Sequence, residues 1–121
     1  LSRNDSCYSS KEADEELLKN LSSPEFVSLL VKIAFDEDDY EGDAPMQAAY
    51  YLSKAPVALA KPFEKQLLRL LPVASGYGGH VALTLGRMKS TEAKAIIQAE
   101  LGDGTRFDAW LFIEALRQYE T

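Results

Sequence analysis

The chain has 121 residues, of which 46% are hydrophobic, and it carries a formal net charge of −6. This length predicts one globular domain with a packed core rather than several domains. The negative charge repels phosphate and argues against a nucleic-acid partner. No apolar stretch is long enough to span a bilayer, so no membrane association is expected.

The negative charge is concentrated in the first third of the chain. Residues 1–43 contain four basic and twelve acidic side chains, a formal charge of −8. The remaining residues contain nine basic and seven acidic side chains, a formal charge of +2. Because opposite charges steer association, a charged partner of this chain is expected to be a basic protein.

The N-terminal residues 1–10 are polar and are expected to form a flexible segment. A single helical-repeat domain is expected over residues 11–121. Cys7 is the only cysteine, which excludes an intramolecular disulfide and is consistent with a reducing compartment. We therefore expect a cytoplasmic protein.

Capping residues mark the first helices. Residues 12–21 carry leucines on one face, which predicts a short amphipathic helix. Ser23, Pro24 and Glu25 form a strong helix start. Serine caps free N–H groups, and glutamate lies near the positive end of the helix dipole. This second helix is expected to run to about Phe35.

Two further helices are expected after the acidic segment, and prolines delimit both. Asp43 is expected to cap a helix that has Pro45 in its first turn and that stops before Pro56. Pro62 is expected to open the next helix, and Pro72 is expected to end it.

Glycines punctuate the C-terminal half of the chain. Residues 75–79 contain three glycines and predict a loop, which is followed by a short helix over residues 80–88. Ser90 or Thr91 is expected to cap a further helix, which Gly102 closes at its C-terminal cap.

The last helix is expected to run from about Phe107 to Tyr119. No segment of the chain alternates apolar and polar residues in the way that a half-buried strand does. The sequence therefore predicts an all-α fold with essentially no sheet.

The helices follow a repeat. Four leucines, each at the end of a short predicted helix, lie 31, 33 and 31 positions apart: Leu21, Leu52, Leu85 and Leu116. A period near thirty residues with two helices in each unit is typical of an α-solenoid.

The clearest unit contains Val81-Ala82-Leu83-Thr84-Leu85-Gly86-Arg87-Met88, Ser90-Thr91-Glu92-Ala93, Ile96-Ile97, Leu101-Gly102-Asp103-Gly104 and residues 107–116. It resembles the HEAT-like repeats of the phycobilisome-lyase type, which read Ala-Ala-x-x-Leu-Gly, a turn, an Ala-x-x-x-Leu helix and a Leu-x-Asp turn. The resemblance implies a short α-solenoid of about four stacked helix pairs. Within this unit Gly86 is expected to end its helix in the left-handed conformation.

An acidic run is the first candidate binding site. Its members are Asp36, Glu37, Asp38, Asp39, Tyr40, Glu41 and Asp43. The run does not match a calcium-binding EF-hand loop, because Glu41 and Gln47 occupy the positions that require glycine and glutamate. Two interpretations remain open, carboxylates that steer a basic partner and a solvated loop.

Catalytic groups do not converge in this sequence. His80 is the only histidine, and Cys7 lies far from it in the sequence, so no acid–base or nucleophile pair is expected. We therefore expect neither an enzyme nor a cofactor nor a metal site. The glycine loop lacks the phosphate-binding pattern, and Tyr77 within it is a candidate protein contact.

Two pairs of aromatic residues complete the candidate contacts. Tyr50 and Tyr51 are adjacent, and Trp110 and Phe112 are two positions apart, so the members of each pair diverge on a helix. One member of each pair is expected to pack and the other to be at least partly exposed. Exposed Tyr and Trp side chains are favoured anchors at protein interfaces.

These features favour a non-catalytic protein-binding module, a monomer or small oligomer. Its specific version is a bacterial immunity protein that neutralises a basic toxin, since the chain resembles that class in size, charge and lack of catalytic groups. Two alternatives remain, a scaffold or adaptor domain of a larger assembly and a protein related to HEAT-like chromophore lyases.

Overall fold

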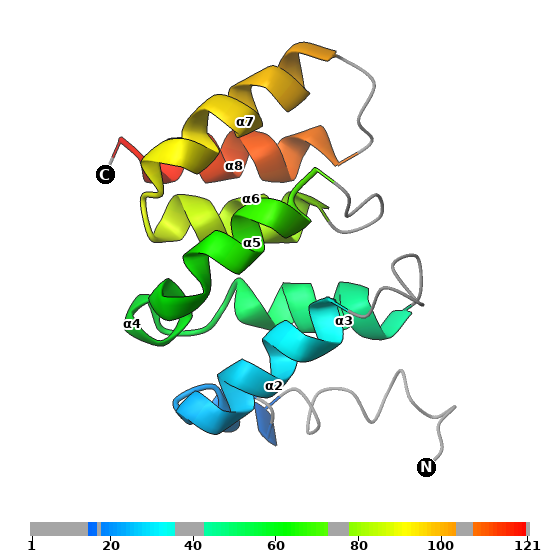
Figure 1. The fold of residues 1–121 in the computed structure, drawn as a ribbon, viewed down its shortest axis with the longest axis vertical. Helices are drawn as coiled ribbons and strands as arrows, with labels where there is room; N and C mark the ends of the chain where they lie inside the picture. The colour runs from blue at the N-terminus through cyan, green and yellow to red at the C-terminus, as the bar shows by residue number, and fades with distance from the viewer. Residues whose placement is uncertain (1–14, 17, 36–42, 73–77, 104–107, 121) are drawn as a thin grey trace.

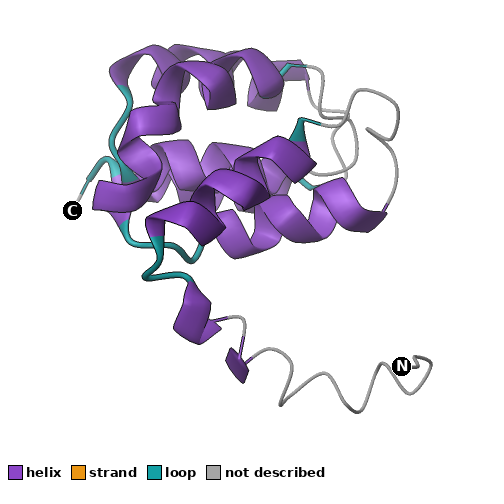
Figure 2. Cartoon of the chain, turned by 60° about the horizontal axis from the view of Figure 1, so that its bottom comes forward, coloured by secondary structure: helices purple, strands orange, loops and turns teal. Residues whose placement is uncertain are grey.

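Helices make up the regular structure of this chain. The computed structural model describes residues 15–16, 18–35, 43–72, 78–103 and 108–120. None of these residues lies in a β-strand, which confirms the predicted all-α class (Figure 2). The N-terminal residues 1–10, for which flexibility is predicted, lie outside the described part.

Seven short helices follow one another along the described chain. Their bounds are α2 Pro24–Ala34, α3 Asp43–Leu52, α4 Val57–Ala60, α5 Glu64–Leu70, α6 Gly78–Arg87, α7 Thr91–Asp103 and α8 Ala109–Gln118. A 3₁₀ turn, η3, spans Lys61–Phe63 between α4 and α5. Before α2, residues 15–16 and 18–20 are helical, as predicted for that part of residues 12–21.

The helices are arranged in two layers, and Figure 1 shows the helices of each layer following one another along the long axis of the molecule. In one layer α3 contacts α6, and α6 makes its most extensive contact with α8. The other layer contains α2, α5 and α7. Of these, α2 packs on α3, α5 packs on α6, and α7 contacts both α6 and α8.

The core lies between the two layers. Its largest fully buried side chains include Leu52, Leu85 and Phe112 from one layer and Leu67 and Ile97 from the other. Each such side chain contributes about 1.5–3 kcal/mol through the apolar surface that it removes from water. Of the four periodic leucines, three are buried and Leu116 is half-buried against the core.

The start of α2 agrees with the sequence prediction. Ser23 is the N-cap, and its hydroxyl accepts a hydrogen bond from the backbone N–H of Phe26 at 3.3 Å. Pro24 is the first helical residue, where the missing N–H removes no intrahelical bond. The helix ends at Ala34, within one residue of the predicted end.

The prediction was less accurate between residues 43 and 72. Asp43 is the first residue of α3. A short helix, α4, was missed after Pro56, and Pro62 lies inside η3 instead of opening α5. Proline is compatible with both the first turn of an α-helix and a 3₁₀ turn, so its position alone does not separate the two.

Four glycines of the C-terminal half lie inside helices, contrary to the sequence prediction. Gly78 and Gly79 begin α6, and Gly86 lies within α6 instead of ending it. Gly102 also lies within a helix, because α7 continues to Asp103. The predicted cap of α7 is confirmed, since the Ser90 hydroxyl accepts a hydrogen bond from the Ala93 N–H at 3.3 Å.

The left-handed residue that follows α6 is Lys89, with a φ of 56°. The N–H of Ser90 donates to the carbonyl of Leu85, and the N–H of Lys89 donates to the carbonyl of Gly86. These two bonds form a Schellman motif in which lysine occupies the position that glycine usually takes. Lysine adopts this conformation at a cost of about 1–2 kcal/mol.

We expect the Lys89→Gly variant to be more stable than the Lys89→Ala variant by about 1 kcal/mol, because glycine alone relieves the left-handed strain. Both variants lose the bond from the lysine Nζ to the carbonyl of Gln118, so the comparison isolates the backbone effect. Urea unfolding followed by circular dichroism measures the difference. Equal midpoints would show that the backbone at residue 89 is unstrained.

Candidate functional site

An apolar groove lies between α2 and α3. Four residues from each helix line it: Phe26, Leu29, Leu30 and Ile33 on α2, and Ala44, Gln47, Ala48 and Tyr51 on α3. Both sets have the spacing i, i+3, i+4, i+7, which places each set on one face of its helix. We call this surface the α2–α3 groove.

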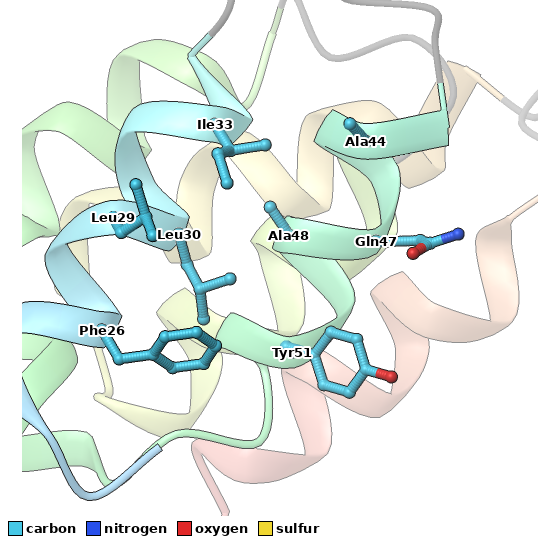
Figure 3. Close-up of a pocket in the computed structure, with 8 residues that line it drawn as sticks. All are labelled: Phe26, Leu29, Leu30, Ile33, Ala44, Gln47, Ala48 and Tyr51. Atoms are coloured by element: carbon cyan, nitrogen blue, oxygen red, sulfur yellow. The ribbon is translucent and has the colours of Figure 1, made fainter. Parts of the chain in front are cut away.

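The α2–α3 groove has a volume of about 230 Å³. Figure 3 shows Phe26, Leu30 and Ile33 pointing from α2 toward α3. Large apolar side chains line the α2 wall, whereas the α3 wall combines two alanines with Gln47 and Tyr51. Leu29 is 50% exposed and keeps the rim apolar.

The α2–α3 groove lies at one end of the layer that contains α3, α6 and α8. On its other side α3 meets α6, where the rings of Tyr50 and His80 lie 5.5 Å apart at their centroids. There the Arg87 guanidinium also donates to the carbonyl of Ser53, just after α3. The groove therefore occupies the side of α3 that α6 leaves free.

The two adjacent tyrosines diverge as predicted. Tyr51 is half-buried against the core and lines the groove, whereas Tyr50 is 36% exposed and faces α6. Their rings make an edge-to-face contact at 5.1 Å, and the Lys54 Nζ lies 4.9 Å from the Tyr50 ring centre. The Tyr50 ring therefore contacts three neighbouring side chains, those of Tyr51, Lys54 and His80.

The second aromatic pair also diverges as predicted. Phe112 is fully buried, whereas Trp110 is 66% exposed. Ile113, one helical turn beyond Trp110 on α8, is 51% exposed. Trp110 and Ile113 form a second apolar surface at the other end of the layer, and we call it the α8 stripe.

His80 is the only described group with a buried, unpartnered polar side-chain atom, its Nδ1. Burial lowers the pKa of His80 below 6.5. The negative charge of Asp108 opposes this shift, and the positive charge of Lys54 adds to it. The Asp108 carboxylate itself accepts a hydrogen bond from the Gly79 N–H at 2.9 Å. The lowered pKa favours the neutral imidazole, which packs against the ring of Tyr50.

We expect the stability of the protein to fall as the pH drops below about 6.5, the usual pKa of an unfolded histidine. The folded pKa of His80 is lowered, so the unfolded chain binds the proton more tightly and acid favours unfolding. Below the folded pKa this contribution levels off. Denaturant midpoints from pH 8 to pH 5 should fall more for the wild type than for His80→Asn. Parallel pH profiles for the two proteins would contradict the lowered pKa of His80. An NMR titration that gives this histidine a pKa of 6.5 or above would contradict it as well.

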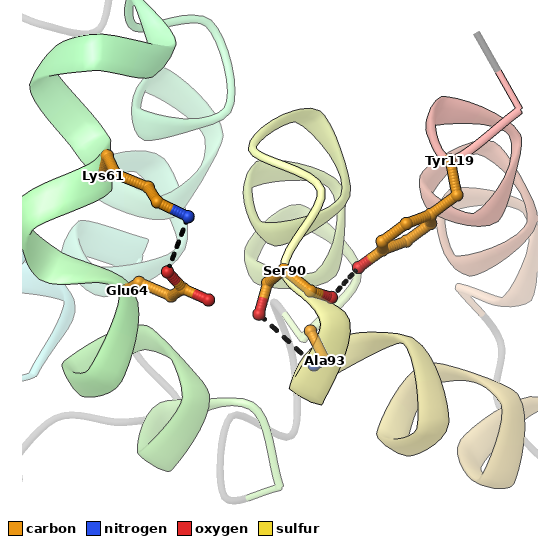
Figure 4. A network of polar contacts seen from close by, with 5 residues as sticks. All are labelled: Lys61, Glu64, Ser90, Ala93 and Tyr119. Atoms are coloured by element: carbon orange, nitrogen blue, oxygen red, sulfur yellow. Dashed lines mark hydrogen bonds and ion pairs between the residues drawn. The ribbon is translucent and has the colours of Figure 1, made fainter.

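A polar cluster joins α5, the start of α7 and the end of α8 (Figure 4). The Lys61 Nζ lies 2.9 Å from the Glu64 carboxylate. The hydrogen bond from Lys61 lowers the pKa of this carboxyl most, and a hydrogen bond from Ser90 lowers it further. The Tyr119 hydroxyl donates to the Ser90 carbonyl at 2.6 Å, and burial raises the pKa of this phenol. These bonds connect helix ends to one another, so the cluster stabilises the packing of the layers.

The structure describes only part of the candidate set predicted from the sequence. Tyr50 and Tyr51 are described and lie side by side. Seven candidates lie outside the described residues, namely Asp36, Glu37, Asp38, Asp39, Tyr40, Glu41 and Tyr77. Asp43 begins α3, and its side chain is not described.

Of the eight groove residues, sequence reasoning proposed only Tyr51 as a candidate contact. The signal that could have found the others is the wide apolar stripe of α2. Val27, Val31 and Ala34 are buried and face the core, while Phe26, Leu29 and Ile33 extend the apolar surface sideways. When an apolar stripe is wider than the area that one packing partner covers, the uncovered part indicates a second contact surface.

Two kinds of site are not found among the described residues. No group of three or more His, Cys, Asp or Glu side chains gathers there in a way that could hold a metal ion. None of the described helices has both the length and the apolar character needed to cross a bilayer. No family model, no curated protein and no solved structure matches this chain.

Proposed function

We propose that this chain is a non-catalytic protein-binding module. The observation that carries the proposal is the α2–α3 groove, a concave surface with an almost wholly apolar lining and an exposed leucine, Leu29, at its rim. Exposed apolar surface of this kind costs free energy in water and is typical of an interaction site. In this proposal the module uses no cofactor.

The proposed architecture is a HEAT-like stack of about four helix pairs. It is supported by the successive contacts of α3, α6 and α8, which carry Leu52, Leu85 and Leu116 at similar positions. The pairing of each of these helices with one from the other layer is a second support. Stacked helix pairs present extended surfaces, and their ends need a covering group or a partner.

The specific version of the proposal is a bacterial immunity protein that acts as a monomer or small oligomer in the cytoplasm. It binds and neutralises a basic toxin and covers the toxin's active surface. Its support is the formal charge of −8 over residues 1–43, which contain α2, one wall of the groove. Such a charge attracts a cationic partner over a Debye length of about 10 Å at 0.1 M salt.

Affinity capture from the native organism's lysate tests this proposal, with the Asp36→Lys/Asp38→Lys/Asp39→Lys variant as the control. We expect one basic protein to bind the native chain and to bind the variant far less. That protein is then purified, and its toxicity and its neutralisation by the chain are measured. A captured protein whose activity the chain leaves unchanged would contradict the immunity function, and no specific capture would contradict the binding function.

A scaffold or adaptor role is the second candidate, and the α8 stripe favours it. Trp110 and Ile113 are both more than half exposed on the last helix, where a further helix of a larger assembly would pack. In that case the isolated chain self-associates through the α8 stripe. Light scattering at low concentration measures the mass of the wild type and of the Trp110→Ser variant. If both are monomeric, the scaffold role is excluded.

A further inference from the structure

The shape of the α2–α3 groove matches a helix. Each wall presents residues at i, i+3, i+4 and i+7, so the lined length is about 10 Å at 1.5 Å per residue. A third helix lying along two such walls contacts both through its own i, i+3, i+4 and i+7 positions. The occupant therefore needs about two turns of apolar helix surface.

The lining of the groove argues against a small polar ligand. Among its eight residues, Gln47 and Tyr51 alone carry polar side-chain groups, and both come from α3. Small-molecule sites combine an apolar pocket with several converging polar groups, and their volumes are about 300–1,000 Å³. A groove of about 230 Å³ without such groups fits apolar side chains that project from a helix.

The charge of the sequence that links the two walls indicates the polar face of that helix. Residues 36–42, which join α2 to α3 in the chain, contain five acidic and no basic side chains, while the exposed Glu25 and Lys32 on α2 offset each other. A helix with lysine or arginine beside its apolar stripe gains attraction to this region, whereas an acidic helix is repelled.

From these features we propose that the α2–α3 groove holds a basic amphipathic helix of the partner protein. The helix presents leucine-like side chains at i, i+3, i+4 and i+7 to the groove and lysine or arginine side chains along its flanks. This inference rests on the proposed protein-binding function and names the element of the partner that is bound.

The probe is a capped peptide of alanine, leucine and lysine, about 18 residues long so that it can form a helix. Its leucines follow the i, i+3, i+4, i+7 pattern. One control peptide replaces every lysine by glutamate, and another has the same composition in scrambled order. Binding to the full chain is measured by fluorescence anisotropy at several salt concentrations, and backbone NMR shifts locate the contact.

Two matched variants separate the groove from other apolar surface. Leu29 lies in the groove and is 50% exposed, and Ile113 lies on the α8 stripe and is 51% exposed. Leu29→Gln and Ile113→Gln therefore remove similar exposed apolar groups without changing the net charge. We expect Leu29→Gln to weaken binding of the basic peptide about tenfold and Ile113→Gln to weaken it less than about twofold.

The proposal is supported if the basic peptide shifts backbone amide signals of α2 and α3 and binds more tightly than both control peptides. The ratio of its affinity to that of the glutamate peptide should then fall as the salt concentration rises. Equal binding of the scrambled peptide, or equal effects of the two variants, overturns the helix assignment. Equal binding of the glutamate peptide at low salt overturns the basic character. A dimer of the free chain that Leu29→Gln dissociates would identify a second copy as the occupant and overturn the proposal.

Failure of this inference is distinguishable from failure of the proposed function. A reconstituted partner that binds Leu29→Gln as tightly as the wild type overturns the groove assignment and leaves the binding function intact. If the basic peptide binds as expected but no native partner is captured, the function fails and the groove's preference for a basic helix stands.

Discussion

Replacing Gly86 by alanine is expected to destabilise the protein by about 2–3 kcal/mol, through overpacking between α6 and α8. A Cβ atom on Gly86 would lie 2.5 Å from the carbonyl oxygen of Ala115 and 3.1 Å from its Cα. These are backbone atoms of a packed helix, so no side-chain rotation relieves the clash. The two helices must move apart, and they make the most extensive helix contact of the described chain.

Gly102 provides the matched control for this substitution. It lies within α7, and a Cβ atom there would meet no atom within 4 Å. Gly102→Ala is therefore expected to stabilise the protein by up to about 1 kcal/mol, because alanine has the higher helix propensity.

Urea unfolding of both glycine variants gives the comparison directly. The two midpoints should move in opposite directions from the wild type. If Gly86→Ala is as stable as the wild type, the close approach of α6 to Ala115 is wrong. If Gly102→Ala is destabilised, Gly102 requires a conformation that alanine disfavours.

Removing the guanidinium of Arg87 is expected to destabilise the protein by about 2 kcal/mol. Its Nη1 donates to the carbonyl of Ser53 and, at 2.9 Å, to the carbonyl of Ala55. These carbonyls lie just after the end of α3, so one side chain of α6 satisfies two acceptors of the neighbouring segment. Ser53 and Ala55 are buried, and losing bonds from a charged donor costs about 1.5–3 kcal/mol.

The variant to measure is Arg87→Met, which keeps most of the aliphatic stem and removes the donors. Arg117→Met is the control, because the Arg117 side chain is 70% exposed and its contact with Glu114, at 3.5 Å, is a surface ion pair. Such pairs contribute about 0–1 kcal/mol. Thermal or urea unfolding should show a clear loss for the first variant and little for the second. Equal small losses would mean that water replaces the guanidinium at both carbonyls.

Two helix starts and the divergence of neighbouring aromatic side chains were determined by the sequence itself. Ser23 was predicted as a cap, and Ser90 was one of two predicted caps with Thr91; both serines are caps, because a cap depends on a side chain and an N–H group only three residues away. Phe112 and Trp110 were predicted to face different environments, and they do, because helical periodicity separates neighbouring positions in any tertiary context.

The roles of the glycines and of Lys89 were decided only by tertiary structure. Glycine is compatible with a left-handed cap and with a close helix contact, and the sequence does not distinguish them. Gly86 is required by the backbone of α8, which lies about thirty residues later in the chain. Lys89 takes the left-handed position because α6 continues past Gly86 and its closing hydrogen bonds fall on Lys89 and Ser90.

The candidate site divides in the same way. The amphipathic character of α2 and α3 and the acidity of residues 1–43 follow from the sequence alone. The groove does not, because it exists only where the side of α3 away from α6 meets the exposed edge of α2. An apolar stripe shows that a helix packs, but its packing partners determine how much of that stripe stays open to another protein.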